Sequence, residues 1–208
     1  MLKQPCRVPF GLQPDQECST PKGGNMMRAV KRLGMSAAII GAMSAAPVLA
    51  QEIPADASNF YKSESVTMRQ VTFPNQYKMN IAGNLFLPKN LDQKKKHAAI
   101  IVGHPMGAVK EQSANLYAVK MAEQGFVTLS VDLAFWGGSE GRPRNAVSPD
   151  LYAETFSAAV DFLGTNPLVD RERIGVIGIC GSGSFAISAA KIDPRLKAIA
   201  TISMYDMG

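Results

Sequence analysis

The 208-residue sequence holds 22 lysine and arginine residues against 17 acidic residues, a formal net charge of +5. Residues 1–50 carry 6 of the basic and 2 of the acidic residues, which leaves 16 against 15 in the rest of the chain. A chain this close to neutral gives no support for a nucleic-acid partner, which would require a clustered basic surface. Residues 51–208 are long enough for one domain with one hydrophobic core.

The first predicted element is a signal peptide over residues 26–50. Basic residues at positions 28, 31 and 32 form its positive start, and the uncharged apolar run over 33–48 is too short for a comfortable bilayer span. Small residues before position 51 predict cleavage after Ala50. We therefore expect a periplasmic or secreted protein with no stable membrane insertion after cleavage.

Residues 1–25 precede the predicted signal peptide and show no periodicity, so we interpret them as an upstream misreading of the gene. Two of the three cysteines, Cys6 and Cys18, fall in this stretch. Cys180 is then the only cysteine of the mature part and cannot form an intrachain disulfide. A lone thiol in an exported chain is either retained for its reactivity or is an inert core residue.

The mature part begins with two predicted strands, 65–73 and 77–87, joined by a turn at 74–76, with a break or bulge expected at 80–84. Strands and helices then alternate. Strands are predicted at 98–102, 126–131, 173–178 and 198–203, and helices at 114–124, 148–163 and 182–192. The helix at 148–163 is expected to be capped by the hydroxyl of Ser148 and ended by Gly164. This order predicts an α/β fold, a mostly parallel sheet with helices on both faces.

The stretch from Arg173 to Gly183 is the most informative about chemistry. It reads as a buried strand, a tight turn and the start of a helix, with Cys180 at the apex. Gly178 and Ser182 lie two positions to either side, and a nucleophile elbow needs small residues there because its turn is so sharp. The overlapping window around Ser182 offers an alternative nucleophile, although it lies two residues into the predicted helix.

Three other segments lie where an α/β-hydrolase would need them: 104–107, 132–141 and 169–174. With the elbow, they resemble the α/β-hydrolase superfamily over about residues 65–208. The run Gly-His-Pro-Met-Gly with Lys-Glu-Gln soon after, residues 103–112, is similar to that of a group of bacterial hydrolases. Those resemble dienelactone hydrolases, which also use an elbow cysteine, and fungal polyketide transferases.

The resemblance implies acyl-enzyme chemistry on a small-molecule ester, lactone or thioester, by hydrolysis or by acyl transfer, without a cofactor or metal. It implies that Cys180 is the nucleophile. The backbone N–H groups of Gly181 and Met106 would stabilise the oxyanion.

Four further residues are expected to line the site. His104 would shape the loop that carries Met106, and Asp132 would tie down its own loop. Glu111 would either hydrogen-bond near the thiol or, more ordinarily, form a surface pair with the preceding lysine. Gly107 completes the set.

The family order is nucleophile, then acid, then histidine, yet both histidines of the sequence, His97 and His104, precede Cys180. The acids that follow the elbow are Asp193 and Asp206. We therefore expect the N-terminal portion of a hydrolase, ending after about the sixth strand and inactive as a triad enzyme by itself.

Two other functions compete. Residues 181–186 fit the G-x-G-x-x-A pattern of a dinucleotide-binding fold, with Asp206 as a candidate ribose-binding acid. A non-catalytic binding protein that retains a hydrolase scaffold is the third interpretation, since a fold does not fix a function.

Overall fold

The structure, a computed structural model, describes residues 54–206. The predicted upstream extension and signal peptide, residues 1–50, lie outside this part of the chain. Within the described part, no helix combines the length and the apolar character needed to cross a membrane.

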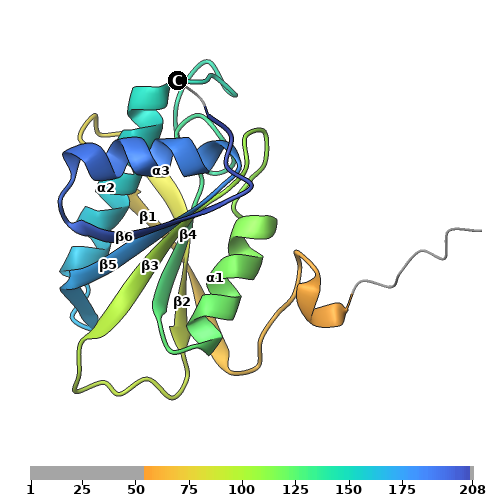
Figure 1. The fold of residues 1–208 in the computed structure, drawn as a ribbon, viewed down its shortest axis with the longest axis vertical. Helices are drawn as coiled ribbons and strands as arrows, with labels where there is room; N and C mark the ends of the chain where they lie inside the picture. Colours follow the sequence, from red (N-terminus) through yellow and green to blue (C-terminus); the bar gives the residue numbers. More distant parts are fainter. Residues whose placement is uncertain (1–53, 207–208) are drawn as a thin grey trace, which may run out of the picture. The chain divides into compact units, whose positions relative to one another are not determined.

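Residues 54–206 contain one six-stranded sheet in the order β1-β2-β4-β3-β5-β6 (Figure 1). β1 pairs antiparallel with β2, and β2 pairs antiparallel with β4, whereas β4, β3, β5 and β6 run parallel to one another. The bounds are Val66–Pro74 for β1, Asn80–Pro88 for β2, His97–Gly103 for β3, Val127–Val131 for β4, Val169–Ile179 for β5 and Leu196–Ile202 for β6. The predicted α/β class and mostly parallel sheet are confirmed.

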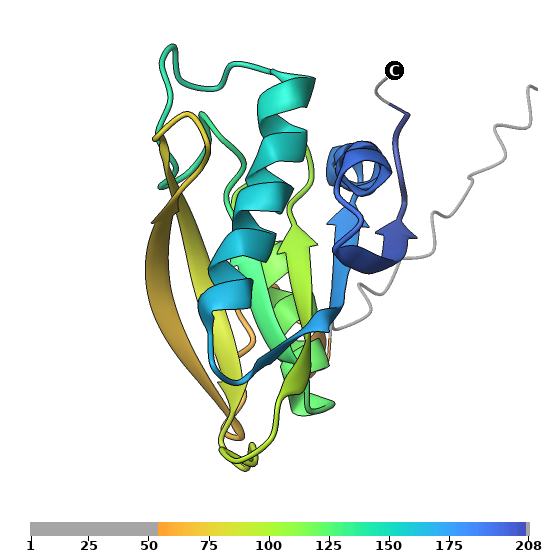
Figure 2. The ribbon, with the colours of Figure 1, turned by 90° about the vertical axis from the view of Figure 1, so that its left-hand side faces the viewer.

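Helices cover both faces of this sheet, as predicted. The helix α1 (Ser113–Glu123) packs in one buried cluster, while α2 (Pro149–Thr165) and α3 (Gly181–Ile192) pack in another (Figure 2). A short 3-10 helix, Ala55–Ala57, precedes β1. Neighbouring residues of one strand enter opposite clusters: in β3, Ile101 faces α2 and α3 while Val102 faces α1. Because side chains alternate along a strand, a strand covered on both faces reads as the continuous apolar run seen in the sequence.

The bulge expected at 80–84 is absent, and that prediction was wrong. β1 and β2 pair without a register shift from Pro74↔Asn80 to Val66↔Pro88. The glycine that suggested a break, Gly83, serves close strand packing instead. A Cβ there would lie 2.9 Å from Leu129 Cδ1 and 3.0 Å from the carbonyl oxygen of Ser130 on β4. Glycine inside a strand therefore marks close approach of another chain segment at this position.

The ends of α2 also differ from the prediction. Ser148 occupies the N-cap position, but its side chain makes no capping hydrogen bond. Gly164 lies inside the last turn, and the helix ends one residue later. A glycine costs a helix only about 1 kcal/mol relative to alanine, so packing of the preceding turns outweighs it.

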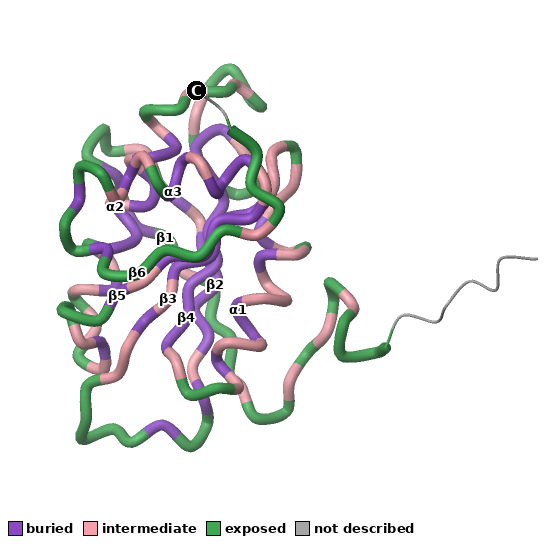
Figure 3. The backbone as a smooth tube through the Cα atoms, viewed as in Figure 1, coloured by how far each residue is buried: buried purple, intermediate pink, exposed green. Residues whose placement is uncertain are grey.

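The parallel strands bring three loops to one edge of the sheet. β3, β4 and β5 lie side by side and run in the same direction, so their carboxyl ends meet. Residues 104–112 follow β3, residues 132–148 follow β4, and Cys180 follows β5. Burial is concentrated in the central strands, whereas β6 is largely exposed (Figure 3).

Candidate active site

Cys180 stands at the apex of the turn between β5 and α3, with φ +55° and ψ −121°. A non-glycine residue at positive φ is strained, and such strain is maintained where the surrounding structure holds the backbone. Here the N–H of Cys180 donates to the carbonyl of Ile202 (2.9 Å), and its own carbonyl accepts from Gly183 (3.0 Å) and Tyr205 (3.2 Å). The half-buried thiol is thus presented on a fixed backbone.

The small residues predicted around the elbow have a direct steric reason. A Cβ on Gly178 would lie 2.4 Å from the carbonyl oxygen of Ser182 and 2.6 Å from Gly183 Cα. Those are backbone atoms of the next helix turn, so they cannot move aside without changing the turn itself. Gly178 is therefore required for β5 to pass directly into α3.

Met106 and Gly181 are brought together, as the oxyanion prediction requires. A Cβ built on Gly181 would lie 3.3 Å from Met106 Cβ and 3.8 Å from the Met106 backbone nitrogen. Gly181 is the first residue of α3, a position whose N–H has no acceptor within the helix. It also lies at the positive end of the helix dipole, which favours a negative charge nearby.

His104 is fully buried, and both of its ring nitrogens are engaged. Nδ1 donates to the carbonyl of Pro105 (2.7 Å), and Nε2 accepts from the N–H of Leu133 (3.1 Å). Burial lowers the pKa of the His104 imidazole, which keeps it in this neutral form. The ring therefore shapes its loop, and it offers no free nitrogen to take a proton from a nucleophile.

The other histidine lies far from the elbow. His97 is the first residue of β3, at the opposite end of the parallel strands, and its Nε2 is 2.9 Å from the carbonyl oxygen of Asp92. Neither histidine of the sequence is therefore placed to act as the base for Cys180.

Ser182 is fully buried in the first turn of α3. Its hydroxyl donates to the carbonyl oxygen of His104, so it joins the helix to the loop after β3. The fit is tight, because a Cβ on Gly103 would lie 2.8 Å from Ser182 Oγ. These contacts describe a structural hydroxyl without solvent access.

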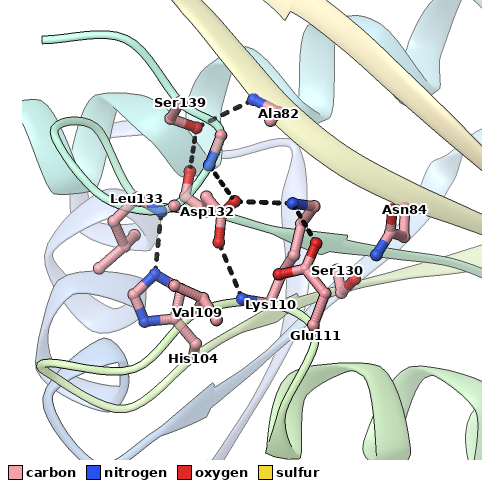
Figure 4. Close-up of polar contacts among 12 residues, drawn as sticks. Ala82, Asn84, His104, Val109, Lys110, Glu111, Ser130, Asp132, Leu133 and Ser139 are labelled. Atoms are coloured by element: carbon pink, nitrogen blue, oxygen red, sulfur yellow. Dashed lines mark hydrogen bonds and ion pairs between the residues drawn. The ribbon is translucent and has the colours of Figure 1, made fainter.

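Asp132 follows β4 and is fully buried, with three donors on its carboxylate (Figure 4). Oδ1 accepts from the backbone N–H of Lys110 (2.8 Å). Oδ2 accepts from Lys110 Nζ (2.7 Å) and from the N–H of Gly138 (2.8 Å). Asp132 thus holds its own loop, as expected, and additionally holds the end of the loop after β3.

The Lys110–Glu111 pair exists, at 2.6 Å between Nζ and Oε1, but the lysine is not on the surface. Its residue is only 6% exposed, whereas the Glu111 side chain is 45% exposed. Burial acts to lower the pKa of Lys110, but its hydrogen bonds to Asp132 and Glu111 outweigh that effect and raise it. Gly107 adopts φ +77° with nothing near its Cβ position, so its requirement is conformational.

Lys110 was missed as a site residue. In the sequence it precedes a glutamate in a polar stretch, which is typical of a solvated pair, and its burial depends on a carboxylate 22 positions away. Asp193, one of the acids after the elbow, lies just beyond the end of α3 and binds Arg195, which lowers the pKa of its carboxyl. Within residues 54–206, no group of three or more histidine, cysteine or acidic side chains is arranged to hold a metal ion.

A mostly parallel sheet covered by helices on both faces, with a strained residue on a strand-to-helix elbow beside a loop from the neighbouring strand, defines an α/β-hydrolase fold. The sequence matches the dienelactone hydrolase family over residues 81–206, and the chain belongs to that family.

Three curated relatives show how far the likeness extends. Uncharacterized protein PA2218 of Pseudomonas aeruginosa is 54% identical over 148 residues, covering 71% of this chain and 40% of the relative. Uncharacterized protein YcjY of Escherichia coli is 39% identical, covering 66% and 45%. Thiohydrolase aneE of Aspergillus aculeatus is 32% identical, covering 67% and 42%.

The crystal structure of the hypothetical protein PA2218 superposes with a TM-score of 0.70 at 52% identity, covering 76% of this chain and 49% of that one. The chain therefore spans less than half the length of each of these relatives. Membership of this family leaves the dinucleotide-binding interpretation without support, and residues 181–186 instead form the start of the elbow helix.

Proposed function

We propose that this chain carries the nucleophile and the oxyanion donors of an acyl-transfer site, with Cys180 forming a covalent acyl-enzyme. The observation that carries the proposal is the strained apex at Cys180 directly beside Gly181 and Met106. In this proposal the backbone N–H groups of Gly181 and Met106 stabilise the negative charge that develops when the Cys180 thiol reacts.

In the proposed step the Cys180 thiolate attacks the carbonyl carbon of the substrate and a carbon–sulfur bond forms. The carbonyl electron pair moves to oxygen, where the N–H groups of Gly181 and Met106 stabilise it. The intermediate then collapses, the bond to the leaving group breaks, and the leaving group departs with that electron pair. Water completes a hydrolysis, whereas another nucleophile completes an acyl transfer.

The proposal assigns no base to this sequence, because His97 lies at the other end of β3 and both nitrogens of His104 are occupied. The isolated chain is therefore expected to be acylated about once per molecule, with negligible turnover. Ser182 is not proposed as the nucleophile, because its buried hydroxyl is committed to His104.

The substrate class of the proposal is an ester, lactone or thioester. Cysteine nucleophiles suit all three, because each presents a carbonyl carbon and a leaving group. The name of thiohydrolase aneE supports the thioester within this set. We further propose that the chain is exported through the predicted signal peptide, so that the substrate is met outside the cytoplasm.

The test compares two reactions of the same thiolate in the full chain. Acylation by p-nitrophenyl acetate passes through an oxyanion, whereas alkylation by iodoacetamide displaces iodide without one. The ratio of the two rate constants at Cys180 is measured at about pH 9, with the modified peptide located by mass spectrometry. N-acetylcysteine is the reference, and we expect the ratio at Cys180 to be at least about tenfold higher because two oxyanion donors assist acylation.

The control is Cys180→Ala, in which no acetyl group should be found on the peptide that contains the elbow. A ratio at Cys180 equal to that of N-acetylcysteine would show that no oxyanion donors act there and would overturn the proposal. Acetylation of Ser182 in place of Cys180 would transfer the nucleophile to the serine.

A further inference from the structure

The loop that carries Met106, residues 104–110, is held at both ends by two consecutive residues after β4. At its first residue, His104 Nε2 accepts a hydrogen bond from the N–H of Leu133 (3.1 Å). At its last residue, Lys110 is bound through its backbone N–H (2.8 Å) and its Nζ (2.7 Å) by the carboxylate of Asp132. Met106 therefore lies on a short span with both ends fixed to a single point of the neighbouring strand.

That fixed point is itself anchored on the sheet. The N–H of Asp132 donates to the carbonyl of Ala82 on β2 (2.9 Å). The carbonyl of Asp132 accepts from Ser139 Oγ (2.7 Å), and the same hydroxyl accepts from the N–H of Ala82 (2.9 Å) (Figure 4). Positioning of the loop thus passes from β2 through Asp132 to Lys110.

The ion pair between Lys110 and Asp132 is buried on both sides, with side-chain exposures of 8% and 0%. A buried pair of this kind is weak evidence for stability, since both charges lose their hydration. What it supplies is a fixed geometry, because charge-assisted hydrogen bonds are short and directional. Glu111 adds a third, half-exposed charge on the solvent side of Lys110 at 2.6 Å.

We propose that Lys110 and Asp132 are positioning residues for the oxyanion site, holding the Met106 N–H beside Gly181. This inference rests on the proposed function, because it assigns to the pair the task of aligning one of its two oxyanion donors. Neither side chain contacts the reacting atoms in this role. A misplacement of about 1 Å in such a group can reduce a rate by about 100-fold.

The main variant is Lys110→Met, which retains the length of the side chain and removes the charge. Because it leaves the Asp132 carboxylate buried without its cation, a second variant, Lys110→Met with Asp132→Asn, removes both charges. The measured quantity is again the ratio of acylation to alkylation at Cys180 in the full chain. We expect both variants to reduce this ratio by roughly tenfold or more, with alkylation alone changed far less.

A purely structural role would lower the thermal midpoint of unfolding without changing the ratio at temperatures where the chain is folded. The matched control is Lys120→Met on α1, which removes a partly exposed lysine paired with Asp56 and Glu123. Its ratio should equal that of the unmodified chain.

The outcomes separate the two proposals. An elevated ratio in the unmodified chain that persists in both variants overturns the positioning inference and leaves the proposed function intact. A ratio in the unmodified chain no higher than that of N-acetylcysteine overturns the proposed function and this inference with it. A reduced ratio in both variants, with the Lys120→Met control unchanged, supports both.

Discussion

At Gly178 the backbone of the elbow comes closer to the following helix than any side chain would permit. The atoms that a Cβ would meet belong to the backbone of residues 182 and 183, and they also set the direction of α3. The same turn places Cys180 at positive φ. One glycine therefore determines both the helix start and the presentation of the thiol.

Replacing Gly178 by alanine is expected to destabilise the chain by about 1–3 kcal/mol, the range typical of overpacking. It should also reduce the rate of acylation at Cys180, because relief of the clash must displace the elbow. Urea unfolding and the acylation assay measure the two effects.

Gly164→Ala is the matched control, since the nearest atom to its Cβ position is 3.6 Å away and the residue lies within α2. There alanine should stabilise by about 0.5–1 kcal/mol through its better helix propensity. Equal effects at both positions would contradict the steric explanation of Gly178.

Residues whose roles depend on local geometry could be predicted from the sequence, and those whose roles depend on distant partners could not. The elbow is formed by residues close together in the sequence, so the spacing of Cys180 and its small neighbours was enough to predict it. Lys110 and Ser182 derive their environments from Asp132 and from the carbonyl of His104, which lie far away in the chain. The sequence alone therefore left Ser182 as an alternative nucleophile, because its burial is visible only in the folded chain.

Among the elements, β6 differs from the other parallel strands in its exposure. It pairs with β5 along one edge, and it ends the sheet formed by the described strands. Five of its seven residues are exposed, including Ile199 at 44%. An exposed strand edge with apolar side chains is a template for pairing with another chain.

We therefore expect the isolated 208-residue chain to self-associate as its concentration rises. Ile199→Lys should reduce this association, because a charged side chain on an edge strand opposes edge-to-edge pairing. Light scattering over a concentration series measures the effect.

Lys197→Arg on the same strand is the control, since it retains the charge of a residue already half-exposed. The explanation would be wrong if Ile199→Lys associated as strongly as this control.

The element boundaries agreed with the sequence pattern to within a few residues, because apolar periodicity reports burial directly. The error at residues 80–84 had a physical cause. Gly83 was interpreted as a sign of a local irregularity. It is instead required by the close packing of β4, a strand that is adjacent to β2 only in the folded sheet. Glycine alone does not distinguish a bend from close packing.

For the whole molecule, charge is distributed unevenly, with most of the positive excess in residues 1–50. This distribution fits a cationic leader in front of a nearly neutral domain. The positive net charge of the full sequence is therefore mainly a property of residues 1–50 and not of residues 51–208.

The export proposal predicts that a bacterial periplasm will contain a product beginning at Gln51. Ala50→Leu should block this cleavage, because signal peptidase requires a small residue before the cut. Ala46→Leu, inside the apolar run, should be processed normally. N-terminal sequencing of the periplasmic product shows whether cleavage follows Ala50. An uncleaved chain in the cytoplasm would contradict export.

The attachment of both ends of the 104–110 loop to adjacent residues restricts how this region can vary. Asp132 and Leu133 are neighbours in the chain directly after β4. The distance between the two anchors of the loop is therefore set by the peptide unit that joins these two residues. Because both anchors are fixed, an inserted or deleted residue between them must be accommodated within residues 105–109, which include Met106. Variation between 104 and 110 that leaves both anchors in place should therefore be in side-chain identity more than in length.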